Sequence, residues 1–311
     1  MHYPWPLTTD QQACYNARGD VIPGSSSGQV APRERSRQAI VQRFENRGDI
    51  VHDTVTGLRW SRNANPFEFP YTWGEAFDLI DGMNRSRTQG HDDWRLPSRR
   101  ELFSIISHQR INPALPMRHP FADVFHGYYW TATACARLPD QAWYVHLGGG
   151  RVYRGMQKGA YLVWPVAGRA NNPVPPIPRF RSRDCMVEDR WTGLRWTSTA
   201  YTGAAHMTWE DALAAPTVLN QEKHGGCSAW RLPNIRELES LVDLARHSPA
   251  LAADHPFQEV QEGYWSSTTS VYEPRYAWVV YMQDGAVGVG FKPEATFSAW
   301  AVAGGDKMRT V

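Results

Sequence analysis

Side chains that could perform covalent or metal chemistry are few in this chain, and their spacing builds no known catalytic motif. The four cysteines lie far apart, at positions 14, 135, 185 and 227. The chain contains no Gly-x-Ser-x-Gly elbow and no P-loop. The acidic cluster His91-Asp92-Asp93 is smaller than the set of about 6–8 oxygen ligands that calcium takes. We therefore expect no enzyme, no metal centre and no cofactor.

Arginines and aromatic rings are the residues whose abundance suggests a chemistry. Arginine outnumbers lysine 29 to 4, and the chain has 38 aromatic side chains (14 Trp, 13 Tyr and 11 Phe). A guanidinium group binds sulfate, carboxylate or phosphate through two parallel hydrogen bonds and stacks on aromatic faces. A GC-rich genome also enriches arginine, so the excess alone does not establish an anion-binding role.

Candidate ligand-binding residues are the cationic and aromatic side chains that gather in two regions of the sequence. Both regions are expected to form strands and loops, and binding sites concentrate on loops that a rigid scaffold supports. The first set is Arg137, Tyr144, His146, Arg151, Tyr153, Arg154 and Lys158, and the second set is Tyr272, Arg275, Tyr276, Phe291 and Lys292.

The composition excludes several classes of protein. With 311 residues, 42% of them hydrophobic and 21% charged, the chain is typical of a soluble globular protein. No apolar run approaches the ~18 residues of a transmembrane helix, and four cysteines are too few for a disulfide scaffold. A net charge of +2 argues against nucleic-acid binding. The amino terminus has no signal-peptide pattern, which fits an intracellular protein or a mature exported one.

An internal repeat reveals the elements that must position these residues. The segment Thr56-Gly-Leu-Arg-Trp60 recurs as Thr192-Gly-Leu-Arg-Trp196, at an offset of 136. Twelve of the 14 tryptophans fall into six matched pairs. A repeat of this length is a whole domain rather than a solenoid unit. A second shared motif, Trp-Arg-Leu-Pro, comprises Trp94, Arg95, Leu96 and Pro97 in one copy and Trp230, Arg231, Leu232 and Pro233 in the other.

The repeat divides the chain into five parts. They are an N-terminal arm (1–44), a first domain (45–168), a linker (169–181), a second domain (182–304) and a C-terminal tail (305–311). Four prolines between positions 169 and 178 favour an extended polyproline II linker. The matched tryptophans are expected to be mostly core. The Trp-Arg-Leu-Pro motifs are expected to be scaffold, with the arginine paired inside the domain.

Each copy is predicted to form a short hairpin, two helices and several antiparallel strands, which is an α+β pattern. Capping-box spacing begins helices at Thr72-x-x-Glu75 and Ser98-x-x-Glu101, and Asn234-x-x-Glu237 does so in the second copy. Runs of aromatic and β-branched residues at 129–133, 142–147, 151–153 and 161–166 predict strands.

The ordered motifs resemble the DUF1566 family, also called the Lcl C-terminal domain family after the C-terminal domain of Legionella collagen-like adhesins. Both copies carry, in this order, Thr-Gly-Leu-x-Trp, Thr-Trp, Trp-Arg-Leu-Pro-x-x-x-Glu-Leu, Tyr-Trp-Ser/Thr-x-Thr, Ala-Trp and Trp-x-Val-x-Gly. The arm also resembles the family's start at Cys14-Tyr15-Asn16 through Ile22. There Gly24 stands where the family carries a second cysteine.

The resemblance implies two tandem C-type-lectin-like domains in a protein of the bacterial surface. Characterised relatives are adhesins that bind sulfated glycans and surface proteins diversified by retroelements. We therefore expect a non-enzymatic, adhesin-like protein of the periplasm, cell surface or exterior, with a glycan or protein ligand and no nucleic-acid partner. Binding by both domains would add avidity. The alternatives are an accessory subunit of a surface filament or envelope complex, and a retroelement-diversified display protein.

Overall fold

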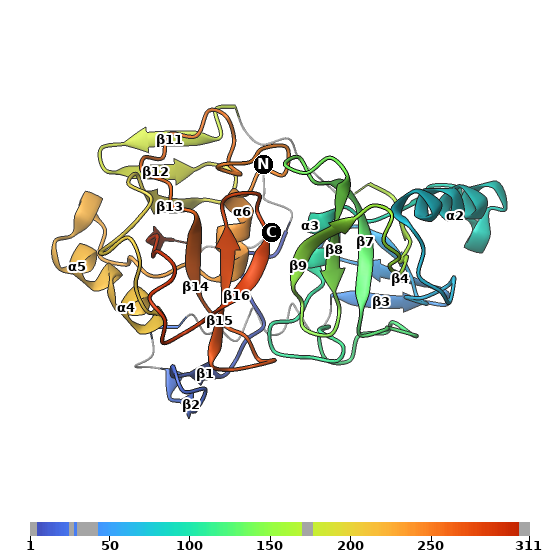
Figure 1. Cartoon of the computed structure of the whole chain (residues 1–311), viewed down its shortest axis with the longest axis horizontal. Coiled ribbons are helices and arrows are strands. Elements are labelled where there is room, and N and C mark those ends of the chain that lie inside the picture. Colours follow the sequence, from blue (N-terminus) through green and yellow to red (C-terminus); the bar gives the residue numbers. More distant parts are fainter. Residues whose placement is uncertain (1–4, 25–27, 30–42, 170–176, 305–311) are drawn as a thin grey trace. The chain divides into compact units, whose positions relative to one another are not determined.

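The computed structural model describes residues 5–24, 28–29, 43–169 and 177–304 (Figure 1). The chain forms two compact units, one around each copy of the repeat. Residues 7–24 and 28–29 of the arm belong to the unit of the second domain. The C-terminal tail and residues 170–176 of the predicted linker lie outside the described residues. Each domain is an α+β structure of antiparallel strands and short helices, as the sequence predicted.

The first domain contains two groups of strands and two α-helices. The strand order in one sheet is β3 (Phe44–Arg47), β4 (Ile50–Asp53), β5 (Arg59–Ser61), β10 (Val166–Ala167) and β6 (Trp94–Arg95). A second group is the antiparallel series β7 (Tyr128–Ala134), β8 (Gln141–His146) and β9 (Val152–Met156). The helices are α2 (Trp73–Arg85) and α3 (Arg99–Ser104), with a 3-10 turn η2 (Thr88–Gly90) after α2.

The second domain repeats this plan. Its first sheet has the order β11 (Phe180–Arg183), β12 (Met186–Asp189), β13 (Leu194–Thr197) and β17 (Val302–Ala303). Its second group is β14 (Gly263–Thr269), β15 (Tyr276–Tyr281) and β16 (Val287–Phe291). The helical segments are α4 (Trp209–Ala214), α5 (Pro216–Gln221), η3 (His224–Gly226) and α6 (Ile235–Leu241).

The predicted helix starts are confirmed. Thr72, Ser98 and Asn234 each accept a hydrogen bond from the backbone N–H three residues on. The carboxylate of the glutamate at that third position accepts a hydrogen bond from the cap residue's own N–H, which completes the capping box. Local sequence therefore fixes these three starts.

The expectation of two helices per copy is wrong for the second domain. The helix that runs without interruption from Trp73 to Arg85 in the first domain is divided into α4 and α5 in the second. Pro216 is the first residue of α5 and takes the place of Ile80. Proline has no backbone N–H to continue the helical ladder, so the helix is interrupted there.

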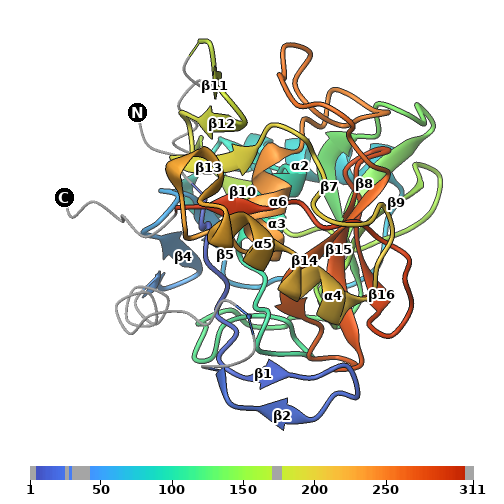
Figure 2. The same cartoon turned by 90° about the vertical axis from the view of Figure 1, so that its left-hand side faces the viewer.

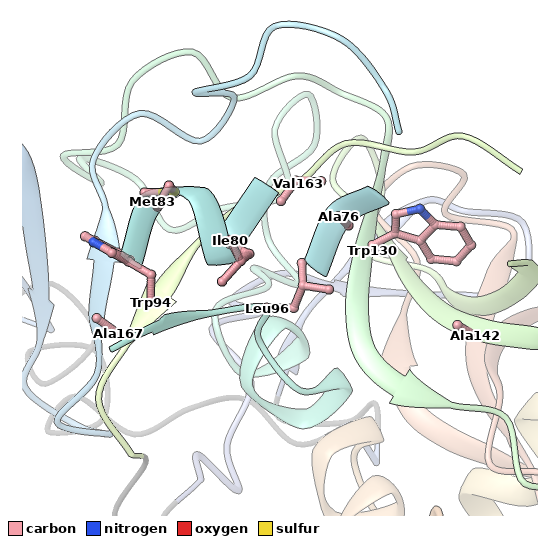
Figure 3. Close-up of a cluster of buried hydrophobic side chains, with 9 residues drawn as sticks. All are labelled: Ala76, Ile80, Met83, Trp94, Leu96, Trp130, Ala142, Val163 and Ala167. Atoms are coloured by element: carbon pink, nitrogen blue, oxygen red, sulfur yellow. The ribbon is translucent and has the colours of Figure 1, made fainter. Parts of the chain in front are cut away.

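Matched aromatic residues form the core of each domain. Trp60 and Trp164 meet at 5.3 Å between ring centroids, and Trp196 and Trp300 repeat this contact at 5.3 Å. All four are fully buried. Figure 3 shows a neighbouring cluster in which α2 packs on strand residues of the first domain; it comprises Ala76, Ile80, Met83, Trp94, Leu96, Trp130, Ala142, Val163 and Ala167.

The arginine of each Trp-Arg-Leu-Pro motif is paired with a glutamate inside its own domain. Arg95 donates two hydrogen bonds, of 2.7 and 2.6 Å, to the carboxylate of Glu101. Arg231 repeats both distances with Glu237. Each arginine also binds the carbonyl of the glycine that closes its domain, Gly168 or Gly304. The arginine therefore links the end of the domain's last strand to the start of α3 in the first domain and of α6 in the second.

A buried arginine lies just before the first strand of each domain. Arg43 pairs with Asp53, and Arg179 pairs with Asp189, with shortest distances of 2.6 and 2.7 Å. All four side chains are buried. These pairs therefore contribute to the interior of the domains.

Residues 7–24 and 28–29 of the arm fold against the second domain. It forms a small hairpin of β1 (Cys14–Tyr15) and β2 (Val21–Ile22), with Cys14 opposite Ile22. Figure 2 shows this hairpin in blue, beyond the end of the second domain that carries α4. Within the described residues, no helix is long and apolar enough to cross a bilayer.

Candidate ligand-binding site

Tyrosine side chains gather on one face of the strands β7, β8 and β9. In the antiparallel register Tyr128 lies opposite His146, and Tyr144 lies opposite Tyr153. Opposite residues point to the same face of a sheet. Tyr161 reaches this face from the chain after β9, held by backbone hydrogen bonds of 2.8 and 2.9 Å with Tyr71. We call Tyr128, Tyr144, His146, Tyr153 and Tyr161 the tyrosine cluster.

The rings of Tyr128, Tyr144, His146 and Tyr161 are in direct contact. The centroid of Tyr128 lies 4.9 Å from that of Tyr144, 5.4 Å from that of Tyr161 and 4.8 Å from that of His146. Such spacings are those of favourable edge and offset contacts. Tyr128 and Tyr153 remain 46% and 43% exposed, whereas Tyr144 and Tyr161 are half-buried. The cluster is thus a packed platform with two rings open to solvent.

Two groups of the cluster, Tyr144 and His146, have pKa values that keep them neutral at pH 7, and a cation stands beside them. Burial, together with Tyr161 and Tyr128, raises the pKa of Tyr144 to about 12. Burial and the charge of Arg151 lower the pKa of His146. Arg151 acts on both groups and is exposed. The site therefore offers aromatic faces, phenol hydroxyls and one guanidinium group.

The other members of the first predicted set lie around this platform. The guanidinium carbon of Arg154 stands 4.7 Å from the ring centroid of Tyr153. Arg154 lies opposite Trp143 in the strand register, so its Cβ is on the face of the sheet opposite to the tyrosine cluster. Lys158 is exposed, and Arg137 is half-buried in the loop after β7. The structure thus brings Tyr144, His146, Arg151 and Tyr153 together and leaves Arg137 and Lys158 peripheral.

The tyrosine cluster has no equivalent in the second domain. The repeat aligns Tyr128, Tyr144 and Tyr153 with Gly263, Val279 and Gly288. The space is filled instead by Phe297 and Tyr281, whose rings lie 5.7 Å apart. A Cβ added at Gly263 would meet the Phe297 ring at 2.7 Å, so that position has no room for a tyrosine.

The second predicted set does not form one surface. Tyr272 is 61% exposed, and Tyr276 and Phe291 contact each other at 5.2 Å between ring centroids. Arg275 is paired with Glu273 at 3.0 Å. Lys292, in contrast, is fully buried. The ligand roles of this set remain predictions.

Lys292 is buried because the arm covers it. Its Nζ donates hydrogen bonds of 3.0 Å to the carbonyl of Asn16 and 3.0 Å to Oγ1 of Thr269. It also stands 3.9 Å from the ring centroid of Trp209 and 5.9 Å from that of Tyr15. Burial lowers the pKa of Lys292 from its ordinary value of 10.5 to about 7. The side chain therefore holds the arm by a hydrogen bond and is not exposed to solvent.

Sequence reasoning missed two members of the cluster, Tyr128 and Tyr161. Tyr128 directly precedes the matched pair Tyr129-Trp130, but its own counterpart is Gly263. Tyr161 has Phe297 as its counterpart. A comparison that looked for differences between the copies, instead of matches, would have found both.

The described residues contain no group of three or more metal-ligating side chains, and the described cysteines are unpaired. Asp93 of the His91-Asp92-Asp93 segment is paired with Arg59 at 2.6 Å. Asp92 is paired with Arg87 at 3.3 Å. These carboxylates serve as partners of arginine.

Comparison with known proteins identifies the repeated unit. The family described as the Lcl C-terminal domain matches the chain twice, at residues 49–167 and 185–303. Together the two matches cover more than half of the chain, and each lies within one copy of the repeat. No curated protein matches the chain.

Proposed function

The chain belongs to the Lcl C-terminal domain family through both of its domains, and on this premise we propose that it is a non-enzymatic, adhesin-like binding protein. We place its ligand site at the tyrosine cluster of the first domain. Its site of action is outside the cytoplasm, and each domain is a lectin-like scaffold.

The proposed ligand is a glycan with sulfate or carboxylate groups. Exposed aromatic rings pack against the apolar faces of sugar rings, while the hydroxyls of Tyr128 and Tyr153 reach sugar hydroxyls. The guanidinium group of Arg151 can donate two parallel hydrogen bonds to a sulfate or carboxylate group of the glycan. The observation that carries the proposal is the platform of touching tyrosines with an exposed arginine at its border.

We propose one such site per chain. The second domain replaces three of the tyrosines with Gly263, Val279 and Gly288. Avidity between two equivalent sites in one chain is therefore not part of the proposal.

The test is binding of the full chain to a panel of sulfated, carboxylated and neutral glycans at low and near-physiological salt. We expect Arg151→Ala to weaken binding to the sulfated members by about tenfold or more, because a hydrogen bond to a charged group contributes about 1.5–3 kcal/mol. Tyr153→Ala should weaken binding to all bound members, because it removes a ring and not a charge.

Matched controls come from the second domain. Arg183→Ala removes an exposed arginine, and Tyr272→Ala removes a tyrosine that is 61% exposed. Both should leave binding unchanged. The tyrosine cluster is refuted as a glycan site if the variants of the second domain weaken glycan binding as much as those of the first domain. It is also refuted if the chain binds no glycan of the panel.

A further inference from the structure

In the second domain, the arm of the same chain binds along the edge of the sheet at the end of β14. The carboxamide of Gln11 pairs with the backbone of Thr269 at the end of β14. Its Nε2 donates to the carbonyl of Thr269 at 2.7 Å, and the N–H of Thr269 donates to Oε1 at 2.9 Å. Both residues are buried. One side chain thus satisfies a donor and an acceptor of the strand.

The arm makes further contacts on either side of Gln11. Nδ2 of Asn234, the cap of α6, donates to the carbonyl of Leu7 at 2.9 Å. The N–H of Ala17 donates to the carboxylate of Glu210 at 3.1 Å. Gly28 lies beside Leu213 of α4, where an added Cβ would be 3.6 Å away. The arm therefore runs from the start of α6, past the end of β14, to α4.

The repeat locates the same path on the first domain. The counterparts of Asn234, Thr269 and Trp209 are Ser98, Ala134 and Trp73, and Leu213 corresponds to Phe77. Every residue of β14 is buried, whereas Tyr128, Ala132 and Ala134 of β7 are exposed. Trp209 is fully buried, whereas Trp73 is half-buried and Phe77 is 37% exposed. We call Trp73, Phe77 and residues 132–134 the open edge.

The open edge keeps the backbone geometry that the arm uses on the second domain. The residue after Ala134 and the residue after Thr269 make the same ladder bond, Cys135 N to Gln141 O at 3.0 Å and Ser270 N to Tyr276 O at 2.9 Å. Because ladder bonds alternate in direction along a strand, the N–H of Ala134 points away from β8, as that of Thr269 points away from β15. The N–H of Ala132 already donates to the carbonyl of Pro97 at 2.8 Å, so the N–H of Ala134 is the group through which this edge can hold a peptide.

The open edge differs in the side chains that select the arm. Ser98 replaces Asn234, Gly74 replaces Glu210 and Gln157 replaces Lys292. What the first domain adds is aromatic surface, because Trp73 and Phe77 meet at 4.9 Å between ring centroids. The open edge therefore lacks three side chains that bond the arm on the second domain, and it would hold a peptide by the backbone and by ring packing.

We propose that the open edge binds an extended segment of a partner protein that carries a glutamine or asparagine and, four residues later, an aromatic residue. The spacing is that of Gln11 and Tyr15 in the arm. The carboxamide pairs with Ala134, and the aromatic ring packs on Trp73 and Phe77. This surface does not include the tyrosine cluster, so the proposal stands independently of glycan binding.

The test uses the full chain and synthetic ten-residue peptides. The probe is Leu-Thr-Thr-Asp-Gln-Gln-Ala-Ser-Tyr-Asn, which is residues 7–16 with serine in place of cysteine. The chain's own arm stays on the second domain, so the added peptide reports on the first. We expect saturable binding of one peptide per chain. Leucine at the first glutamine, or alanine at the tyrosine, should weaken it at least fivefold.

Two variants of the protein locate the site. Ala134→Pro removes an N–H that points away from the sheet, a position where an edge strand tolerates proline. It should weaken peptide binding about tenfold, since it prevents one hydrogen bond and crowds the other, without changing the thermal midpoint. Phe77→Ser should weaken binding at least fivefold. Its control is Phe125→Ser, which removes another exposed phenylalanine, 60% exposed, and should have no effect.

A comparison variant separates the two domains. Thr269→Pro removes the N–H that bonds Gln11 and the Oγ1 that holds Lys292. It should release the arm and expose Cys14 to a thiol reagent, but it should create no second peptide site, because the N–H that a peptide carboxamide needs is lost with it. Absence of probe binding to the unmodified chain would overturn the proposal. Probe binding that Ala134→Pro leaves unchanged would also overturn it.

Discussion

At the residue scale, buried arginine–carboxylate pairs fix the first strand of each domain. Arg43 donates to Asp53 through two nitrogens, at 2.8 and 2.6 Å, and also to the carbonyl of Ser104. Arg179 does the same with Asp189 and Ser240. Each pair thereby links a hairpin to the end of a helix that lies 61 residues away in sequence.

Removing one arginine should be costly because its aspartate would stay buried without a partner. We expect Arg43→Ala to lower the free energy of unfolding of the first domain by about 3–5 kcal/mol, and Arg179→Ala to do so for the second. Urea unfolding followed by tryptophan fluorescence measures both. Arg47→Ala breaks an exposed pair with Glu45 and should leave the midpoint unchanged. Equal effects of Arg43→Ala and Arg47→Ala would contradict this role.

Lys292 predicts a pH dependence for the unit formed by the arm and the second domain. The groups that face its ammonium are Glu210, Cys14, Tyr15, Trp209 and Thr269. Its pKa is about 7 in the folded protein and 10.5 when the chain is unfolded. The folded state therefore binds the proton less well, and the penalty for burying the charge is complete below pH 7.

The free energy of unfolding should rise as the pH increases from 7 toward 10, by at most about 1.4 kcal/mol per pH unit from this group. Below pH 7 the contribution should be constant. Urea titrations of the wild type and of Lys292→Met between pH 6 and pH 10 measure it as the difference between two profiles. Parallel profiles would show that Lys292 does not titrate in this range.

At the scale of elements, the cap of α6 has two tasks. The Oδ1 of Asn234 accepts from the N–H groups of Arg236 and Glu237, while its Nδ2 holds the arm at Leu7. In the first domain Ser98 performs only the capping task. The change from serine to asparagine adds a donor without loss of the cap.

Exchange of these residues should separate the two tasks. Asn234→Ala should destabilise the second domain by about 1 kcal/mol or more through loss of the cap. Asn234→Ser should restore most of that stability but leave the arm loosened. Urea unfolding reports the first effect, and the reaction rate of the buried Cys14 with a thiol reagent reports the second. If Asn234→Ser protects Cys14 as well as the wild type does, the bond to Leu7 is unimportant for the arm.

At the scale of the whole molecule, duplication has produced two domains with the same core and different surfaces. The second domain holds the arm, and the first presents the tyrosine cluster and the open edge. The family's pattern for the arm includes a second cysteine, where this chain has Gly24. In the structure a Cβ at Gly24 would lie 3.5 Å from Sγ of Cys14, so a cysteine at position 24 would be close to Cys14.

We expect Gly24→Cys to form a disulfide with Cys14 under oxidising conditions. The bond should stabilise the arm by about 2–4 kcal/mol, because it restricts the unfolded chain. Mass spectrometry of the intact and reduced protein detects the bond, and urea unfolding with and without reductant measures its effect. The single variant Cys14→Ser in the same background is the control. Two free thiols after oxidation would show that the two positions do not meet.

The sequence alone was sufficient for features that are local or repeated. The capping boxes at Thr72, Ser98 and Asn234 depend on residues three positions apart, so short-range chemistry specifies them. The matched tryptophans marked the core because both copies must fill the same interior. The family and the α+β class followed from these patterns. The break at Pro216 was also visible in the sequence, but its effect on the helix was overlooked.

Only the tertiary structure decided which surfaces are open. Tyr128 and Tyr161 join the candidate site because strand register brings them onto the face of Tyr144, and register is not visible in a list of residue types. Lys292 is sealed by the carbonyl of Asn16, 276 residues away in sequence. Exposure depends on such long-range contacts, which neither spacing nor composition records. The sequence therefore does not show whether Lys292 is exposed or buried. In the folded chain it is buried and bonded to the arm.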